Sequence, residues 1–385
     1  MIYSFGASNL NSFKDGFQVS FELGSKVPKS ISRGKKLSNV VGIKGANASG
    51  KTNILKALSL IVDVAVDSFS LKPNENLGFS SHFRSDKNSN FYIDLEAGGV
   101  RYTYELTANN SRIVREKIYK KLSRKTLILD RHEDKIVSRT QEFSELDIIE
   151  IRSNASIIST AAQYKFKTPL TDLTNIHTQL SHVRGNVFSF GVNENPSMFK
   201  IDSVSKLYYH TPEALSFAIK QIREADLGIV NIEVSERTDE SGNKIYFPLF
   251  LHKTENLTHW LTIFDQSSGT VSLYKRLWVY WYVLKVGGTL ILDEFDANCH
   301  PMLLPNLIDL FDDPETNPHG AQFIFTAQNS EILDTLGKYR TILVNKEQGE
   351  SYCYRLDEIP GDLIRNDRPI SPLYRDGKIG GVPKL

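Results

Sequence analysis

Residues 45–52 read GANASGKT and fit the pattern G-x-x-x-x-G-K-[ST]. The run before them, residues 39–43, is short, apolar and β-branched, as expected of a buried parallel strand. The run after them, residues 53–61, carries apolar residues at helical spacing. A glycine-rich turn between a strand and a helix lets successive N–H groups point at phosphate oxygens, and the helix N-terminus adds partial positive charge. The stretch therefore predicts an α/β P-loop fold that binds a nucleoside triphosphate.

Within this phosphate loop (residues 45–52), two side chains have expected roles. Lys51 would reach the β- and γ-phosphates, and the Thr52 hydroxyl would ligate Mg²⁺. The residues that we expect to contact ATP from this part of the chain are Gly45, Asn47, Ala48, Ser49, Gly50, Lys51, Thr52 and Asn53. A glycine-rich turn that binds no nucleotide is the alternative interpretation.

Composition indicates an ordinary globular protein. The chain has 385 residues, 40% of them hydrophobic and 24% charged, with a formal net charge of +1. Because the net charge is so small, binding to nucleic acid or to a membrane would need a local patch. Two cysteines, Cys299 and Cys353, argue against a disulfide framework and fit a reducing compartment. The apolar stretch near residues 60–66 is too short to span a bilayer, and the N-terminus does not read as a signal peptide. We expect a soluble cytoplasmic protein that does not bind membranes.

A second apolar strand ends in two acids. Residues 289–294 read TLILDE, and in a P-loop protein this would be the second nucleotide strand. Asp293 would hold Mg²⁺ through water, and Glu294 would lie beside the γ-phosphate and polarise the attacking water. Acidic strand ends are common, so the motif carries weight only together with the phosphate loop.

Residues 265–270 read DQSSGT and lead into an expected helix. A serine-glycine turn at a helix N-terminus offers free N–H groups, a hydroxyl and the helix dipole to an anion. Simple N-capping is the alternative. The turn lies about 23 residues before the Asp-Glu pair.

The phosphate loop, the Ser-Gly-Thr helix start and the Asp-Glu strand, in this order, resemble the ABC-type ATPases of the SMC/RecF/OLD-like branch. The opening residues 2–21 and His300-Pro301 are similar to that family. Residues 365–383 resemble the terminal segment of AAA-family ATPase subunits in PARIS- and AbiL-like phage-defence loci, where nuclease genes stand beside them. The resemblance covers about residues 1–66 and 202–385. It implies an α/β P-loop NTPase of ABC-ATPase type, in which a mixed sheet is joined by an antiparallel N-terminal β subdomain and a helical subdomain.

We expect four regions on this basis. They are an N-terminal ATPase lobe with the phosphate loop and antiparallel strands (1–112), an inserted, helical region of uncertain structure (113–201), a C-terminal ATPase lobe with the signature turn and the Walker B strand (202–350), and a C-terminal tail (351–385). The tail is either disordered or packed through Ile364, Tyr374 and Ile379.

The resemblance also implies a site shared by two copies of the chain, in a homodimer or a larger homo-oligomer. ATP and Mg²⁺ bound by one copy would be closed over by the partner copy at positions Ser267, Ser268 and Gly269, and Asp296 would lie in the loop that meets the partner. Such ATPases carry a histidine after the next strand to contact the γ-phosphate, and the matching residue here is Gln328. Glutamine can donate a hydrogen bond but cannot become positively charged. We therefore expect slow hydrolysis that depends on Lys51, Glu294 and Gln328.

The biological role stays open between three hypotheses. The first is an ATPase switch that controls a separate effector, such as a nuclease, in antiviral defence, because only about forty residues follow Asn345 and they are too few for a nuclease domain. The second is a RecF-like DNA-repair clamp that binds DNA or RNA through Arg115–Lys125, which holds six cations in eleven residues. A solvated face is the alternative for that run. The third is a nucleotide-gated scaffold with little hydrolysis.

Overall fold

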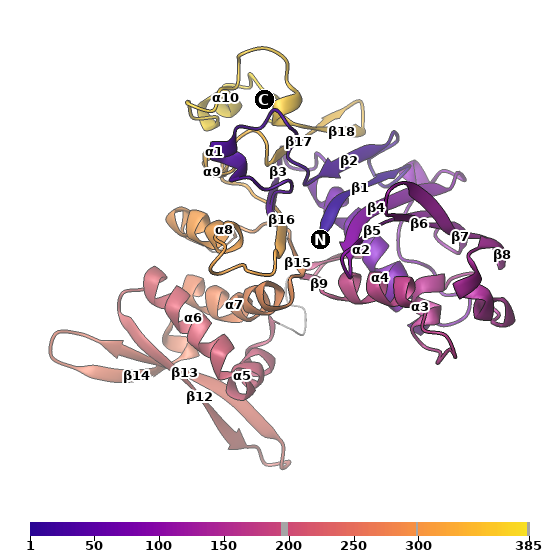
Figure 1. Cartoon of the computed structure of the whole chain (residues 1–385). Helices are drawn as coiled ribbons and strands as arrows, with labels where there is room; N and C mark the ends of the chain where they lie inside the picture. The colour runs from indigo at the N-terminus through magenta and orange to yellow at the C-terminus, as the bar shows by residue number, and fades with distance from the viewer. Residues whose placement is uncertain (194–198, 298, 383–385) are drawn as a thin grey trace.

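The computed structural model describes residues 1–193, 199–297 and 299–382. Two large sheets and a helical lobe with a small sheet of its own make up the molecule (Figure 1). The predicted fold class, an α/β P-loop NTPase with a mixed sheet, an antiparallel N-terminal sheet and a helical part, is confirmed. Among the described helices, none is long and apolar enough to cross a membrane.

The central sheet has six strands in the order β18-β17-β3-β16-β15-β9. Its strands are β3 (Val40–Gly45), β9 (Val183–Gly185), β15 (Thr289–Leu292), β16 (Gln322–Thr326), β17 (Thr341–Glu347) and β18 (Glu350–Arg355). All neighbouring pairs are parallel except β17 and β18. Every residue of β3, β15 and β16 is buried, which explains their continuous apolar sequence. The carboxyl ends of these three strands meet at one edge, where ligands bind in such sheets.

The second sheet is antiparallel, with seven strands in the order β2-β1-β4-β5-β6-β7-β8. Its strands are β1 (Ile2–Ser8), β2 (Phe17–Ser20), β4 (Ser89–Ala97), β5 (Val100–Ala108), β6 (Ile113–Lys121), β7 (Lys125–His132) and β8 (Lys135–Arg139). The strand pair expected at the N-terminus is present. The two β-prone runs on either side of Gly98-Gly99 predict a hairpin, and that hairpin is also present. Both glycines have positive φ angles, 57° and 76°, as a two-residue hairpin turn requires.

Helix α2 (Lys51–Asp67) packs against both large sheets. Eleven of its 17 residues are buried, so it is apolar on nearly all sides. Helices α3 (Ile157–Ala161) and α4 (Thr171–Ser181) also contact it, and a single apolar core joins these elements. Residues 113–139 thus form strands where we expected a helical region, and helices occur only later in the 113–201 segment.

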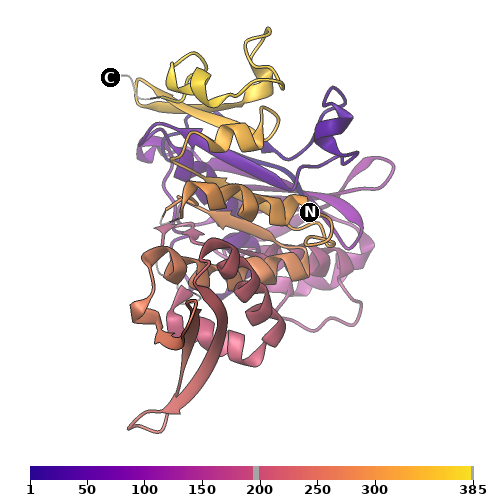
Figure 2. The ribbon, with the colours of Figure 1, turned by 90° about the vertical axis from the view of Figure 1, so that its left-hand side faces the viewer.

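A second lobe holds the helices α5 (Ile201–His210), α6 (Pro212–Ala225) and α7 (Ser268–Val286) and the sheet β12-β13-β14. The sheet strands are β12 (Ile229–Thr238), β13 (Lys244–Lys253) and β14 (Thr258–Thr262), and they project away from the larger sheets (Figure 2). The apolar spacing of residues 202–226 predicts a single amphipathic helix. This prediction is wrong, because Pro212 begins a new helix directly after Thr211. This lobe shares a second apolar core with α8 (Leu304–Asp312).

The C-terminal residues up to 382 are packed, so the disordered alternative is wrong for them. Ile364, Tyr374 and Ile379 are buried in a third apolar cluster with residues of α9 (Ile332–Leu336) and β17. Helix α10 (Ser371–Arg375) lies within this segment and carries Tyr374. The last three residues of the expected tail, 383–385, lie outside the described residues.

Candidate functional site

The phosphate loop connects β3 directly to α2. Gly50 has a φ angle of 112°, a conformation that favours glycine, and Ala48 has a φ angle of 60°. At Gly45 a Cβ atom would lie 2.4 Å from the Val344 carbonyl oxygen, so only glycine fits between β3 and β17. The two glycines at the ends of the motif are therefore required by backbone conformation and by close packing.

Lys51 folds back over its own loop. Its Nζ donates to the carbonyl oxygens of Gly45 at 3.0 Å and Ala46 at 2.9 Å. Burial lowers the pKa of Lys51, and the nearby carboxylates of Asp293 and Glu294 oppose this shift. The ammonium group thus sits inside the loop, where the phosphates of a nucleotide would replace its carbonyl partners.

Thr52 and Asp293, the two residues predicted to hold Mg²⁺, are in direct contact. Thr52 Oγ1 donates to Asp293 Oδ2 at 2.9 Å, and Thr326 Oγ1 donates to Asp293 Oδ1 at 2.6 Å. The Thr52 hydroxyl can ligate Mg²⁺ directly, and the Asp293 carboxylate beside it can accept a hydrogen bond from a water on the same ion. The donor set therefore fits Mg²⁺ held by one hydroxyl and substrate phosphates, with the carboxylate acting through water as predicted.

The backbone around Asp293 is fixed from a second side by Asn186. The Asp293 N–H donates to Asn186 Oδ1 at 2.8 Å, and Asn186 Nδ2 donates to the Asp293 carbonyl oxygen at 3.1 Å. Asn186 follows β9, the edge strand next to β15. Asn186 carries no signal in the sequence, because only the strand order places it beside the Asp-Glu pair.

Glu294 lies at a strained turn. Its φ angle is 50°, which is uncommon for a residue other than glycine. Its N–H donates to Thr326 Oγ1 at 2.9 Å, and the side chain is exposed at the sheet edge. Thr326 therefore contacts both acids of the pair, and the sequence analysis missed it as well. A threonine that ends the strand next to the Asp-Glu strand is the signal that could have revealed it.

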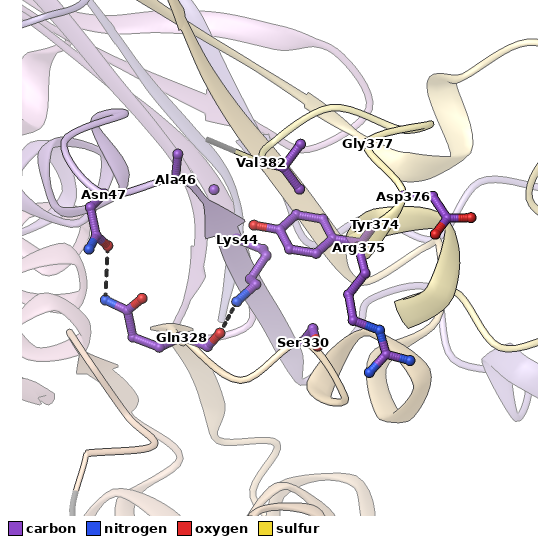
Figure 3. A pocket seen from close by; sticks show the side chains of 11 residues that line it. Lys44, Ala46, Asn47, Gln328, Ser330, Tyr374, Arg375, Asp376, Gly377 and Val382 are labelled. Carbon is purple, nitrogen blue, oxygen red and sulfur yellow. Dashed lines mark hydrogen bonds between the residues drawn. The ribbon is translucent and has the colours of Figure 1, made fainter. Parts of the chain in front are cut away.

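Gln328 connects the loop after β16 to the phosphate loop. Its Nε2 donates to Asn47 Oδ1 at 3.2 Å (Figure 3). The backbone N–H groups of Gln328 and Asn329 donate to the Asp296 carboxylate at 2.6–3.0 Å. Asp296 thus orders the Gln328 loop of its own chain, and its expected contact with a partner copy stays a prediction.

A cavity of about 570 Å³ lies between the phosphate loop, the Gln328 loop and the C-terminal segment (Figure 3). Lys44 projects into it, donates to the carbonyl oxygens of Ala327 and Gln328, and lies 5.2 Å from the centre of the Tyr374 ring. Burial lowers the pKa of Lys44 to about 8. The sequence analysis did not predict that residues 374–382 lie here.

Gly381 explains how the C-terminal segment can approach the phosphate loop so closely. Its φ angle is 75°, and a Cβ atom placed on it would lie 3.7 Å from the Gly45 Cα. The Tyr374 hydroxyl donates to the Gly381 carbonyl oxygen at 2.7 Å, and the Gly381 N–H donates to Asn345 Oδ1 at 2.6 Å. In the sequence, the Gly-Gly pair at residues 380–381 is the feature that could have indicated this close approach.

The signature turn (residues 265–270) begins α7 in the second lobe. Ser267 caps the helix, because its Oγ accepts from the Thr270 N–H at 3.1 Å. Thr270 Oγ1 in turn donates to Asp226 Oδ2 at 3.3 Å. These partners belong to the turn's own lobe, and Figure 1 shows α7 on the far side of β15 from β3 and α2. The N-cap is thus observed, and anion binding by Ser267, Ser268 and Gly269 stays a prediction.

The basic run 115–125 lies on β6, β7 and the turn between them. Three of its six cations pair with carboxylates: Arg115 with Asp130 at 2.7 Å, Lys120 with Asp172 at 2.8 Å and Lys125 with Glu105 at 3.4 Å. These pairs reduce the positive charge that the run offers to a nucleic acid.

Comparison with known proteins gives the family. Residues 40–334 match the model of the family described as "AAA domain, putative AbiEii toxin, Type IV TA system". The chain belongs to this family. It is accordingly a nucleotide-binding P-loop ATPase of AAA type. No curated protein matches the chain.

Two solved structures are similar to the chain. One is an SMC head bound to the C-winged helix domain of ScpA, with 15% identity, a TM-score of 0.49, and coverage of 93% of this chain and 98% of that chain. The other is an Smc head domain with an extended coiled coil bound to the C-terminal domain of ScpA from Pyrococcus furiosus, with 13% identity, a TM-score of 0.46, and coverage of 93% and 97%.

Proposed function

We propose that this AAA-family chain is a slow, Mg²⁺-dependent ATPase switch that assembles head to tail through its nucleotide sites. The observation that carries the proposal is the contact between Thr52 and Asp293, with Glu294 held next to it by Thr326. This contact joins the phosphate loop to the Asp-Glu strand in one place. A loop that only bound phosphate would not require contact with the Asp-Glu strand.

Each residue at the sheet edge has a distinct task in the proposed reaction. Lys51 binds the β- and γ-phosphates, and Thr52 and Asp293 hold Mg²⁺, which neutralises charge on the phosphates when it is bound. Glu294 orients a water and takes its proton. Gln328 donates a hydrogen bond toward the γ-phosphate from the Asn47 side. Because Gln328 cannot carry a positive charge, we expect slow turnover.

Assembly is proposed because the chain places two anion-binding elements in different lobes. The first N–H groups of a helix have no intrahelical acceptor, so Ser268 and Gly269 at the start of α7 can still donate. Their own phosphate loop is not beside them. A second copy in head-to-tail orientation would bring its Ser267–Gly269 to the nucleotide of the first copy. ATP would then stabilise the assembly, and hydrolysis would release it.

The test compares turnover and assembly in matched variants. Lys51→Ala should abolish ATP turnover. Glu294→Gln should abolish turnover but retain binding, and it should form an ATP-dependent dimer or larger oligomer by light scattering. Ser268→Arg in the Glu294→Gln background should remove that assembly without loss of ATP binding. If ATP turnover does not depend on Lys51, the proposed ATPase activity is wrong. If the oligomer forms equally well with and without ATP, the proposed nucleotide-dependent switch is wrong.

For the biological role, we propose control of a separate effector, such as a nuclease, in antiviral defence. The family description, which names a toxin and a toxin–antitoxin system, supports an effector-linked role. Co-purification with the product of the neighbouring gene tests it, and an unrelated neighbour would contradict it. A DNA-repair clamp is the second candidate, and DNA-stimulated turnover that disappears when residues 115–125 are neutralised would favour it. A scaffold with little hydrolysis is the third.

A further inference from the structure

Lys44, near the end of β3, is a buried lysine without a role in the proposed reaction. The residue is only 4% exposed. Burial lowers its pKa to about 8, and the Asp296 carboxylate opposes that shift, so the side chain is still mostly protonated at pH 7. A buried charge is costly unless it is paired and hydrogen-bonded. The groups that compensate the Lys44 ammonium therefore show what this side chain holds in place.

Lys44 holds the loop after β16 through two backbone carbonyl groups. Its Nζ donates to the carbonyl oxygen of Ala327 at 3.3 Å and to that of Gln328 (Figure 3). The Asp296 carboxylate accepts from the N–H groups of Gln328 and Asn329 in the same loop. The loop is thus bonded to a cation through its C=O groups and to an anion through its N–H groups. Hydrogen bonds to a charged partner are about twice as strong as neutral ones, so these contacts fix the backbone at Gln328.

The C-terminal segment keeps the Lys44 side chain in this position. The ammonium group lies 5.2 Å from the centre of the Tyr374 ring, whose face is attractive to a cation. The ring is itself fixed, because the Tyr374 hydroxyl donates to the Gly381 carbonyl oxygen at 2.7 Å. At the start of α10, Ser371 Oγ donates to Asp334 Oδ2 at 2.6 Å and ties the segment to α9. The segment therefore supports the contact between Lys44 and the loop after β16.

The Gln328 side chain depends on this backbone support. Its Nε2 donates to Asn47 Oδ1 at 3.2 Å, and the side chain is exposed. An exposed amide group that makes a long hydrogen bond can turn about its side-chain bonds, so the backbone decides which positions it can reach. A misplacement of about 1 Å near a reacting group can reduce the rate about 100-fold. The anchoring of the Gln328 backbone should therefore affect hydrolysis.

We propose that Lys44 is a positioning residue for ATP hydrolysis, because it holds the Gln328 loop where the Gln328 amide reaches the γ-phosphate. The proposal rests on the proposed ATPase function. Lys44 donates to the backbone of its own chain, whereas Lys51 is the lysine proposed to bind the phosphates. Loss of Lys44 should therefore slow hydrolysis and leave nucleotide binding unchanged.

The test measures kcat for ATP and the Kd of a non-hydrolysable ATP analogue by calorimetry. Lys44→Met fills similar space without a buried charge, so the fold should be retained. It should lower kcat about tenfold and leave the Kd unchanged. Lys44→Arg keeps the charge and the N–H donors, and the adjoining cavity of about 570 Å³ has room for a guanidinium group, so it should restore most of the rate. In a Gln328→Ala background, Lys44→Met should lower kcat no further, because the group that Lys44 positions is absent.

Lys338→Met is the matched control. Lys338 Nζ donates to the Ile364 carbonyl oxygen at 3.0 Å and lies 5.4 Å from the centre of the Tyr339 ring. The substitution therefore removes the same two kinds of contact at a place outside the Gln328 loop. It should change neither kcat nor the Kd of the analogue.

The possible results separate this inference from the proposed function. The positioning role is wrong if Lys44→Met leaves kcat unchanged, or if its Kd for the analogue rises as much as kcat falls. It is also wrong if Lys44→Met causes the same loss of rate with and without Gln328. In each of these cases the ATPase proposal stands. If ATP turnover does not depend on Lys51, the ATPase proposal is wrong and this inference is wrong with it.

Discussion

Thr326→Val is the substitution that tests the centre of the proposed site most directly. Valine keeps the shape and the strand preference of threonine but removes the hydroxyl. That hydroxyl donates to Asp293 Oδ1 at 2.6 Å and accepts from the Glu294 N–H at 2.9 Å. Both proposed functional acids lose a contact, although Thr326 itself is buried and would touch neither nucleotide nor metal.

The magnitude follows from these two hydrogen bonds. The bond to the carboxylate contributes about 1.5–3 kcal/mol. The Glu294 N–H lies at the exposed sheet edge and can recruit water, so its loss adds about 1 kcal/mol at most. We expect the free energy of unfolding to fall by about 1.5–4 kcal/mol. Residues that orient metal ligands typically change affinity or activity about 10–100-fold, and we expect kcat to fall by that factor with a higher Mg²⁺ requirement.

The assay is steady-state ATP turnover as a function of Mg²⁺ concentration, with thermal unfolding measured in parallel. Thr341→Val is the matched control, because Thr341 is equally buried and its hydroxyl donates to the Gly337 carbonyl oxygen at 2.9 Å, outside the site. Thr326→Ser keeps the hydroxyl and should retain turnover. Unchanged turnover and Mg²⁺ dependence in Thr326→Val, with ATP binding intact, would refute the assigned arrangement of Asp293 and Glu294.

Three further predictions concern the surroundings of the phosphate loop. Gln328→His should raise kcat most below about pH 6.5, where the imidazole is protonated and carries the positive charge that glutamine cannot, and the gain should be lost as the pH rises above that value. A kcat equal to that of the wild type at every pH would contradict the role of Gln328. Burial lowers the pKa of Lys44 to about 8 from 10.5, so the folded state binds fewer protons than the unfolded state between these values, and stability should rise with pH there. That rise should be smaller in Lys44→Met, as chemical denaturation at pH 8 and pH 10 would show, and an identical pH dependence would argue against burial of the charge. Gly381→Val should destabilise the fold by about 1–3 kcal/mol more than Gly361→Val. Both glycines have positive φ angles, but an added Cβ would lie 3.0 Å from the Tyr374 ring at Gly381 and would meet no atom within 4 Å at Gly361. Equal losses of stability in denaturant unfolding would argue against that packing.

The parts of the fold that were predictable depend on local sequence. The phosphate loop, the hairpin at Gly98-Gly99 and the Asp-Glu strand each carry their signal within a few residues, and each is present. The break at Pro212 also had a local signal, a proline within an expected helix, and the continuous apolar spacing on both sides outweighed it.

Strands β6 and β8 were not predicted because charge hides their alternation, whereas residues 126–129 within β7 read as a strand-like run. Along β6 the buried positions include Glu116 and Ile118, and Glu116 is fully buried against Arg131 and the Tyr104 hydroxyl. The alternation of apolar and polar residues, from which a strand is predicted, is interrupted when a buried position holds a paired carboxylate. Nothing local in the sequence announces that pairing, since Arg131 lies on the next strand.

The residues missed at the site depend on long-range packing. Thr326 and Asn186 reach Asp293 only because β16 and β9 flank β15, and strand order is not encoded near any one of them. The C-terminal segment reaches Gly45 through contacts with β17. A single sequence specifies the reactive groups of this site better than it specifies the groups that hold them in place.

The two halves of the proposed shared site differ in how complete they are. In the first lobe, Lys51 donates to two loop carbonyl oxygens and Thr52 donates to Asp293, so both side chains are held at the phosphate loop by the chain's own groups. In the second lobe, Ser267 is already used as a helix cap, and the N–H groups of Ser268 and Gly269 have no acceptor within the helix. The phosphate of a nucleotide bound by a second copy is the acceptor that we propose for them.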